Sequence, residues 1–140
     1  MIPVDQTRFG EKAGNCLAAC LASILEIPLE RVCDIPLDDT WQEVVSSWLE
    51  QYGYYYCVVK DLKLPKGCFA IVGGPSPRLK NCYHSVIFCG DKMVHDPHPS
   101  RDGLKGGKRF RQYDLIIPRN PALKMQPSSQ GLAPGYPAED

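Results

Sequence analysis

A cysteine, a histidine and an aspartate carry the strongest chemical signal in this sequence. Cys16 follows Asn15 at the start of an apolar run. His84 lies among strand-forming residues far downstream, and Asp96 comes shortly after it. A thiol attacks a carbonyl only as the thiolate, and both a helix N-terminus and an adjacent imidazole lower its pKa. The three residues therefore predict a cysteine nucleophile that is served by a His–Asp pair.

The nucleophile needs a helix that begins at residue 15, and the local sequence favours one. Asn15 is a good N-cap, because its side-chain oxygen can accept a free backbone N–H, and Gly14 lets the chain turn sharply. Cys20 lies one turn beyond Cys16, and we interpret it as a small core residue. The apolar face predicts a helix over 15–26 and consists of Leu17, Cys20, Leu21, Ile24 and Leu25.

The remaining elements indicate an α+β fold in which N-terminal helices pack on an antiparallel sheet. Pro28 is expected to end the first helix, and a second helix is predicted over about 40–51, with Gly53 ending it. Helices come first and strands second, which is the order typical of α+β domains. Aromatic and β-branched residues predict strands at 54–59, 68–72, 83–89, 92–95 and 110–117.

The predicted strands 83–89 and 92–95 form a hairpin. The length of its loop decides which residue lies beside His84. A three-residue loop over 90–92 with a bulge places Asp96 on the face of His84. A two-residue loop over 90–91 places His95 there instead. Turn chemistry allows both, and we predict the bulged turn because the catalytic interpretation requires it.

Length and composition predict one domain over 1–118 and a flexible tail over 119–140. The tail is rich in proline, glycine, serine and glutamine and has little to bury, so it is expected to contribute little to folding. The 140 residues carry 16 basic and 16 acidic side chains with no long run of either sign. Without a signal-peptide pattern or a span-length apolar stretch, we expect a cytoplasmic protein that binds neither nucleic acid nor membrane.

The seven cysteines form neither a disulfide framework nor a zinc pattern. Their number is odd and the sequence contains no C-x-x-C pair. We expect reduced, buried thiols at positions 33, 57, 68, 82 and 89. His95 and His98 flank Asp96, but neighbours on a strand point to opposite faces, so we expect no metal and no other cofactor.

The catalytic segments resemble the papain-like cysteine peptidases, especially the bacterial branch that cleaves double-glycine leader peptides from bacteriocins. The motifs that carry the resemblance are Asn15-Cys16-x-x-Ala19-Cys20, His84-Ser85-Val86 and Asp96-Pro97. Wider segments also resemble small uncharacterised proteins of bacteriophages and prophages, which suggests a phage-encoded protein in a bacterial host. These segments are 5–10, 73–78 and 94–100, and the resemblance covers about residues 1–104.

The resemblance implies a papain-like fold and a role for each residue. Cys16 is the nucleophile, His84 the general base and acid, and Asp96 the group that orients the imidazole. Gln6 corresponds to the oxyanion donor, and the extra residues between it and the cysteine would form a loop through 9–14. The aspartate-glycine frame of the leader peptidases is missing, so their substrate is not carried over.

Several other residues are expected to bind substrate. Gly73, Gly74, Ser76 and Arg78 follow a predicted strand and could offer backbone N–H groups and a guanidinium to a carboxylate or phosphate. An ordinary inter-strand loop is the alternative. Asn15 and His98, beside the nucleophile and the aspartate, complete the expected substrate-binding set.

These observations leave three hypotheses. The first is a thiol-dependent hydrolase or acyl transferase acting on a peptide or another amide-bearing substrate, which could be a host protein. The second is a papain-like scaffold that binds a small ligand or a host protein without turnover. The third is a metal-binding domain.

Overall fold

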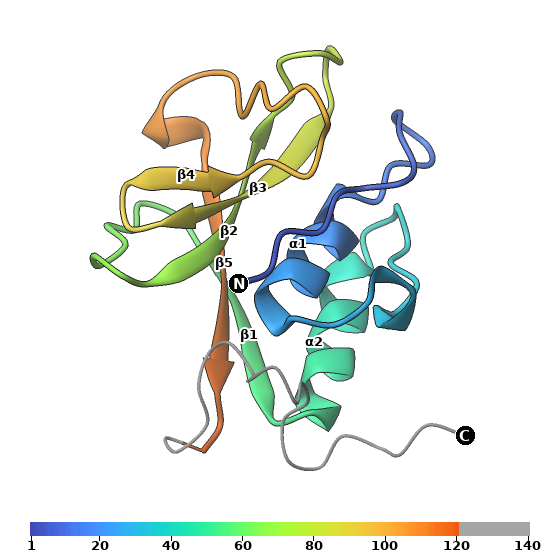
Figure 1. The fold of residues 1–140 in the computed structure, drawn as a ribbon, viewed down its shortest axis with the longest axis vertical. Helices are drawn as coiled ribbons and strands as arrows, with labels where there is room; N and C mark the ends of the chain where they lie inside the picture. Colours follow the sequence, from blue (N-terminus) through green and yellow to red (C-terminus); the bar gives the residue numbers. More distant parts are fainter. Residues whose placement is uncertain (121–140) are drawn as a thin grey trace.

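Two helices cover one face of a five-stranded antiparallel sheet in the computed structural model, which describes residues 1–120 (Figure 1). The strands lie in the order β1-β5-β2-β3-β4, with every neighbouring pair antiparallel. The predicted α+β class is therefore confirmed. The elements are α1 (Cys16–Leu25), α2 (Trp41–Gln51), β1 (Tyr54–Val59), β2 (Phe69–Pro75), β3 (Tyr83–Cys89), β4 (Lys92–His95) and β5 (Gln112–Pro118), with 3-10 helices at Leu29–Arg31 and Lys108–Phe110.

Helix α1 begins at the predicted place but ends earlier than predicted. Glu26 adopts the left-handed conformation, with φ of 56°, and its N–H donates to the carbonyl of Ala22. The N–H of Ile27 donates to the same carbonyl at 3.1 Å. The left-handed residue therefore ends the helix. The expectation that Pro28 ends it is wrong.

The strand predictions hold except at the ends of β2 and β5, which lie one to three residues from the predicted positions. Strand β2 continues past Val72 to Pro75, because its pairing with β3 extends to the Pro75–Tyr83 pair. Strand β5 begins at Gln112 because residues 108–110 form a 3-10 helix. Gly53, with φ of 89°, follows α2 as predicted and turns the chain into β1.

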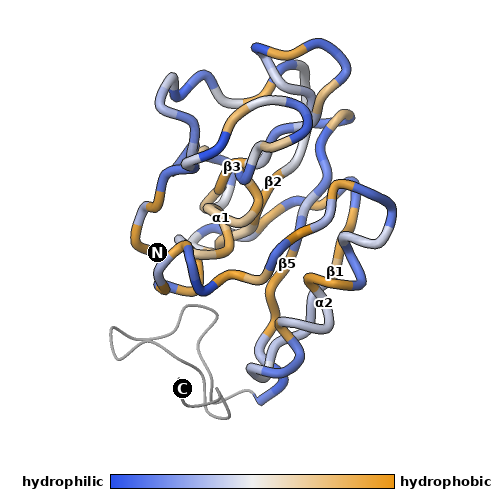
Figure 2. Tube along the Cα trace, turned by 90° about the vertical axis from the view of Figure 1, so that its right-hand side faces the viewer, coloured by the Kyte–Doolittle hydropathy of each residue, from blue (hydrophilic) through white to orange (hydrophobic). Residues whose placement is uncertain are grey.

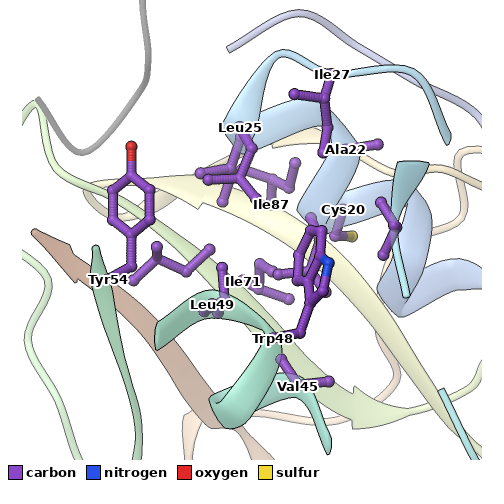
Figure 3. Close-up of a cluster of buried hydrophobic side chains, with 14 residues drawn as sticks. Cys20, Ala22, Leu25, Ile27, Val45, Trp48, Leu49, Tyr54, Ile71 and Ile87 are labelled. Atoms are coloured by element: carbon purple, nitrogen blue, oxygen red, sulfur yellow. The ribbon is translucent and has the colours of Figure 1, made fainter. Parts of the chain in front are cut away.

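The main hydrophobic core lies between the helices and the sheet (Figure 3). Figure 2 shows the hydrophobic segments running through α1, β2 and β3, with hydrophilic loops around them. Burying each large aliphatic side chain contributes about 1.5–3 kcal/mol, so this layer fixes α1 on the sheet. Cys20 is fully buried in it, as predicted. The core includes Leu21, Ile24, Val45, Trp48, Leu49, Ile71, Ile87 and Ile116.

All seven cysteines are free thiols, but the prediction of burial at positions 33, 57, 68, 82 and 89 is wrong at all five. Cys57 is exposed, and the other four members of the expected set are half-buried. Side chains on a strand alternate between its two faces. On β1 the buried Tyr54 and half-buried Tyr56 alternate with the exposed Tyr55 and Cys57.

The N-terminal segment is attached to α1 through one buried serine. The hydroxyl of Ser23 donates to the carbonyl of Ala19 at 2.7 Å and accepts the N–H of Val4 at 2.9 Å. The Ser23 carbonyl accepts the N–H of Ile2 at 3.0 Å. His95, on β4, donates from Nε2 to the carbonyl of Val4 at 2.8 Å. Residues 1–4 are thus held between α1 and the end of β4.

Replacing Ser23 with alanine is expected to lower the free energy of unfolding by about 1–2 kcal/mol, because the N–H of Val4 then loses its acceptor. Urea denaturation followed by circular dichroism measures this change. The control is Ser47→Ala, since Ser47 is an exposed residue of α2. Equal stability of the two variants would show that the Ser23 contact does not hold the segment.

Candidate active site

A buried histidine–carboxylate pair forms the centre of the site. Nε2 of His84, on β3, lies 2.7 Å from Oδ1 of Asp96, and their side chains are 5% and 0% exposed. Oδ1 of Asp96 also accepts the N–H of His98 at 2.9 Å, and Oδ2 accepts the N–H of Gly103 at 2.7 Å. Both carboxylate oxygens are therefore occupied, and the carboxylate cannot rotate away from the imidazole.

The route by which Asp96 reaches His84 differs from the predicted one. Cys89 pairs with Lys92 across the two-residue loop Gly90-Asp91, so the predicted three-residue turn is wrong. A bulge follows inside β4.

In that bulge, Phe88 pairs with Met93 and Ile87 pairs with His95, which leaves Val94 as the extra residue. One extra residue reverses the alternation of side chains beyond it. Asp96 therefore shares the face of His84, and the predicted hydrogen bond between them is present. The glycine of the turn was a correct hairpin signal, but the bulge lies four residues after it.

Cys16 occupies the first position of α1 and interacts with His84 and Ser85 at the start of β3. Burial raises the pKa of the Cys16 thiol, but hydrogen bonds from the His84 side chain and from the backbone and side chain of Ser85 outweigh it, and the pKa lies below 9.0. Because Nε2 of His84 is held by Asp96, Nδ1 is the nitrogen that serves the sulfur. The positive end of the helix dipole, at the N-terminus of α1, stabilises the thiolate further.

The pKa of His84 is shifted upward, opposite to that of Cys16. Burial alone would lower the pKa of His84, but the hydrogen bonds to Asp96 and Cys16 and their negative charges raise it to about 9. Burial would raise the pKa of Asp96, but the hydrogen bonds from His84, His98 and Gly103 lower it to about 2. At neutral pH the site therefore favours a thiolate–imidazolium pair beside an ionised carboxylate.

Asn15 lies at the helix start but does not cap it. Its Oδ1 accepts the N–H groups of Thr7 and Arg8 at 3.0 and 2.9 Å, and its Nδ2 donates to Oγ1 of Thr7 at 3.0 Å. The predicted side-chain cap is therefore wrong, because this side chain binds the N-terminal segment in preference to its own helix. The carbonyl of Asn15 accepts the first helical bond, from Ala19 at 3.0 Å.

Gln6 lines the same cleft as Cys16. The N–H of Gln6 donates to the carbonyl of Pro97 at 3.0 Å, and its Nε2 donates to the carbonyl of Arg8 at 2.9 Å. A turn in which Gly14 donates to the carbonyl of Gly10 at 3.0 Å takes up the long interval to Cys16, as expected. Gln6 is 7% exposed. Its amide has a second N–H, and its Oε1 is buried without a hydrogen-bond partner.

The predicted anion cradle is not a free loop. Gly73 and Gly74 belong to β2, where they pair with Ser85 and His84 of β3, and Gly73 also pairs with Gln112 of β5. Strand pairing therefore occupies this backbone, which corrects the expectation of exposed N–H groups. A Cβ on Gly74 would lie 3.2 Å from Leu104, so close packing explains that glycine.

The other cradle residues bind one another. Oγ of Ser76 accepts the N–H groups of Arg78 and Leu79 at 3.2 and 3.1 Å. The Arg78 guanidinium donates to Oγ of Ser100 at 2.9 Å and lies 3.7 Å from Asp102. Ser76 and Arg78 line the cleft, and both side chains already bind other groups of the protein.

His98 lines the cleft beside His84. Its ring meets His84 edge to face with centroids 6.3 Å apart, and it meets Phe9 in the same way at 5.3 Å. Its Nδ1 accepts the N–H of Ser100 at 3.0 Å. Burial and the nearby Arg78 charge lower the pKa of His98. His98 is therefore placed to contact whatever occupies the cleft.

A cleft of about 720 Å³ opens over these groups. Its edge carries four large apolar side chains that are strongly exposed, Phe9 at 48%, Leu37 at 65%, Leu79 at 43% and Tyr83 at 79%. Other lining residues are Gln6, Asn15, Cys16, Leu17, Ile35, Trp41, Gly73, His84, Ser85, His98, Gln112 and Asp114. Its size and apolar edge fit an extended organic ligand.

Two cleft residues were missed by the sequence analysis. Ser85 donates hydrogen bonds to Cys16. Strand alternation predicts that the side chains of Ser85 and His84 point to opposite faces of β3, so the sequence did not indicate this contact. Asp114 is a carboxylate within the apolar strand β5. A charged residue in such a strand was the available signal for it.

No protein-family model, curated protein or solved structure matches this chain. Within residues 1–120, no helix is long and apolar enough to cross a membrane. The same part of the chain contains no group of three or more histidine, cysteine or acidic side chains that could hold a metal ion. The predictions for 121–140 lie outside the described residues.

Cys16 is expected to be the fastest-reacting cysteine at pH 7, because its pKa is lowered while burial raises that of Cys20 and Cys33. A mass-spectrometric time course with iodoacetamide measures the rates. His84→Ala should slow labelling of Cys16 by roughly ten- to thirtyfold, which is the loss expected when a thiolate reverts to an ordinary thiol. Faster labelling of Cys20 or Cys33 would contradict the assignment of the nucleophile.

Proposed function

We propose that this protein is a thiol-dependent hydrolase or acyl transferase that acts on amide bonds, with Cys16 as nucleophile. The observation that supports it most is that one imidazole, His84, is bound at Nε2 by Asp96 while its other nitrogen serves the thiol at the start of α1. The residue order and the roles resemble those of papain-like cysteine peptidases. A purely structural histidine does not need a thiol partner at a helix N-terminus.

The first half-reaction uses the groups already poised in the cleft. The Cys16 thiolate attacks the substrate carbonyl carbon and forms a C–S bond, and the carbonyl π electrons move to oxygen. The backbone N–H of Cys16 and the free N–H of Gln6 are the donors available to that oxyanion. Nδ1 of His84 then protonates the leaving amine as the C–N bond breaks, which leaves a thioester on Cys16.

The second half-reaction restores the thiolate. Neutral His84 accepts a proton from water, or from an amine in a transferase, while that nucleophile attacks the thioester carbonyl. The C–S bond breaks, the acid or new amide leaves, and the proton on Nδ1 re-forms the imidazolium beside the Cys16 thiolate. Asp96 fixes the tautomer in both halves because it holds Nε2–H throughout.

The form of the cleft supports a peptide as the substrate. Exposed apolar side chains at Phe9, Leu37, Leu79 and Tyr83 provide contact area along its edge. Peptide side chains bury apolar surface in such grooves, which contributes about 25 cal/mol per Å².

The direct test is cleavage of a mixed library of internally quenched peptides. The native protein should release fluorescence, and Cys16→Ser should abolish the release while keeping the circular dichroism spectrum. A Cys16→Ser variant that cleaves as well as the native protein would refute the proposal.

Asp96→Asn is expected to keep the fold and lower kcat/KM by about 10²-fold or more, because the imidazole loses the carboxylate that fixes its tautomer. His95→Ala is the matched control, since His95 binds the N-terminal segment and does not face the cleft. Its kcat/KM should stay within a few-fold of the native value. A larger loss in His95→Ala than in Asp96→Asn would assign the orienting role to the wrong residue.

The pH profile of kcat/KM should be bell-shaped. Activity should rise with pH as the Cys16–His84 pair loses its first proton, below the ordinary thiol pKa of 9.0, and fall as pH passes the His84 pKa of about 9. In Asp96→Asn the alkaline limb should move to lower pH, because the partner that raises the His84 pKa is gone. An unchanged alkaline limb would show that Asp96 does not control the imidazole.

A further inference from the structure

One charged group in the cleft has no part in the reaction described above. Asp114 lies on β5 and is 3% exposed, yet it lines the same cleft as Cys16. Its carboxylate accepts hydrogen bonds from the hydroxyl of Tyr56 and, at 3.4 Å, from Nε2 of Gln112. Within residues 1–120, no lysine, arginine or histidine forms an ion pair with it.

The sheet register fixes where this carboxylate lies relative to the nucleophile. Gly73 of β2 pairs with Ser85, which contacts Cys16, and on its other side with Gln112. Asp114 is two residues further along β5. Strand spacing and rise then separate the Cα atoms of Ser85 and Asp114 by roughly 12 Å. A substrate side chain next to the scissile bond, or one residue beyond, can span that distance.

The floor of the cleft between Ser85 and Asp114 is open because Gly73 has no side chain. A Cβ placed there would lie 3.9 Å from the carbonyl oxygen of His84 and 4.0 Å from Nε2 of Gln112, so nothing in the fold forbids a larger residue. Its φ is not in the left-handed region either. The glycine therefore leaves room over the floor without being required by the backbone.

The approach to Asp114 is apolar. Leu17, Ile35 and Trp41 line the cleft together with the acid, and the ring of Trp41 meets that of Tyr56 edge to face at 6.5 Å. Long cationic side chains bury their methylene stems along such surfaces and keep only the charged head polar. These three apolar side chains and the carboxylate of Asp114 match that division.

We propose that Asp114 selects substrates with a cationic side chain, a primary amine or guanidinium, at or next to the residue that supplies the scissile carbonyl. This inference rests on the proposed function of Cys16. A buried carboxylate without a cation is costly, and a charged substrate group supplies the missing partner. Tyr56 and Gln112 fill only part of the acceptor capacity of the carboxylate, which leaves lone pairs for an N–H donor.

The ionisation of Asp114 agrees with this role. Burial raises the pKa of Asp114 to about 6, although the hydrogen bonds from Tyr56 and Gln112 lower it. The carboxylate is therefore mostly charged at pH 7 and mostly neutral at pH 5. The other titratable groups that face it are Tyr56 on β1 and Cys20 on α1, and burial raises the pKa of both away from this range.

The test uses peptidyl electrophiles that alkylate Cys16. Each pair consists of two probes that are identical except that one carries arginine and the other citrulline, its neutral isostere. One pair has this residue next to the electrophile, and the other pair has it one position further away. In the native protein at pH 7.5 the arginine probe of at least one pair should label Cys16 about tenfold faster or more. Asp114→Asn should reduce that ratio to within about twofold.

The matched control is Glu11→Gln, which removes an exposed acidic group from the edge of the same cleft. It should retain the arginine preference. Loss of the preference in Glu11→Gln to the same extent as in Asp114→Asn would assign the effect to general cleft charge and overturn the inference. Equal rates for the two probes in the native protein at both positions would also overturn it, as would no labelling by either probe.

Two further measurements keep the outcomes distinguishable. The arginine preference of the native protein should decline as pH falls from 7.5 to 5, and a constant ratio would contradict a role for Asp114 even if Asp114→Asn did not fold. Iodoacetamide reports the intrinsic reactivity of Cys16. Selective labelling of Cys16 without discrimination between the probes refutes only the specificity, whereas unselective labelling refutes the proposed function itself.

Discussion

The buried carboxylate of Asp96 is the group on which the rest of the site depends. It binds the imidazole of His84 and two backbone N–H groups, those of His98 and Gly103. Its own carbonyl accepts a hydrogen bond from Arg101, whose guanidinium also binds Asp5 at 2.6 and 2.9 Å. The next residue accepts the N–H of Gln6. One short segment therefore fixes the histidine, the loop after β4 and the segment that carries Gln6.

This arrangement also links the site to stability. The pKa of Asp96 lies below its ordinary value of 3.8, at about 2, so its contribution is present above pH 3.8 and is lost as pH falls through 2. The pKa of His84 lies above its ordinary value of 6.5, at about 9, so its contribution is present below pH 6.5 and is lost as pH rises through 9. The two ionised side chains stabilise the fold most fully between their ordinary pKa values. The ion pair beside the Cys16 thiol therefore also contributes to the stability of the fold.

Local patterns predicted the elements, and non-local contacts decided the details of the site. The helical period of the segment after Asn15 and the β-branched runs after Gly53 gave the α+β architecture, because burial of one face imposes those periods. The position of Asp96 depended on a bulge at Val94, which no turn residue marks. The cap failed for a similar reason, since the Asn15 amide binds Thr7 and Arg8, a contact that local propensity does not contain. The extension of β2 through Gly73 and Gly74 came from pairing with β3, which offsets the low strand preference of glycine.

The cleft holds two buried aspartates whose surroundings give them different properties. Asp96 accepts hydrogen bonds from an imidazole and two N–H groups, which lower its pKa to about 2. The carboxylate of Asp114 accepts hydrogen bonds only from a phenol and an amide, so its negative charge is incompletely compensated. Carboxylates whose environments separate their pKa values in this way serve different purposes in one site. In the proposed reaction the first orients the imidazole of His84, and the second remains available for a cation that arrives with the substrate.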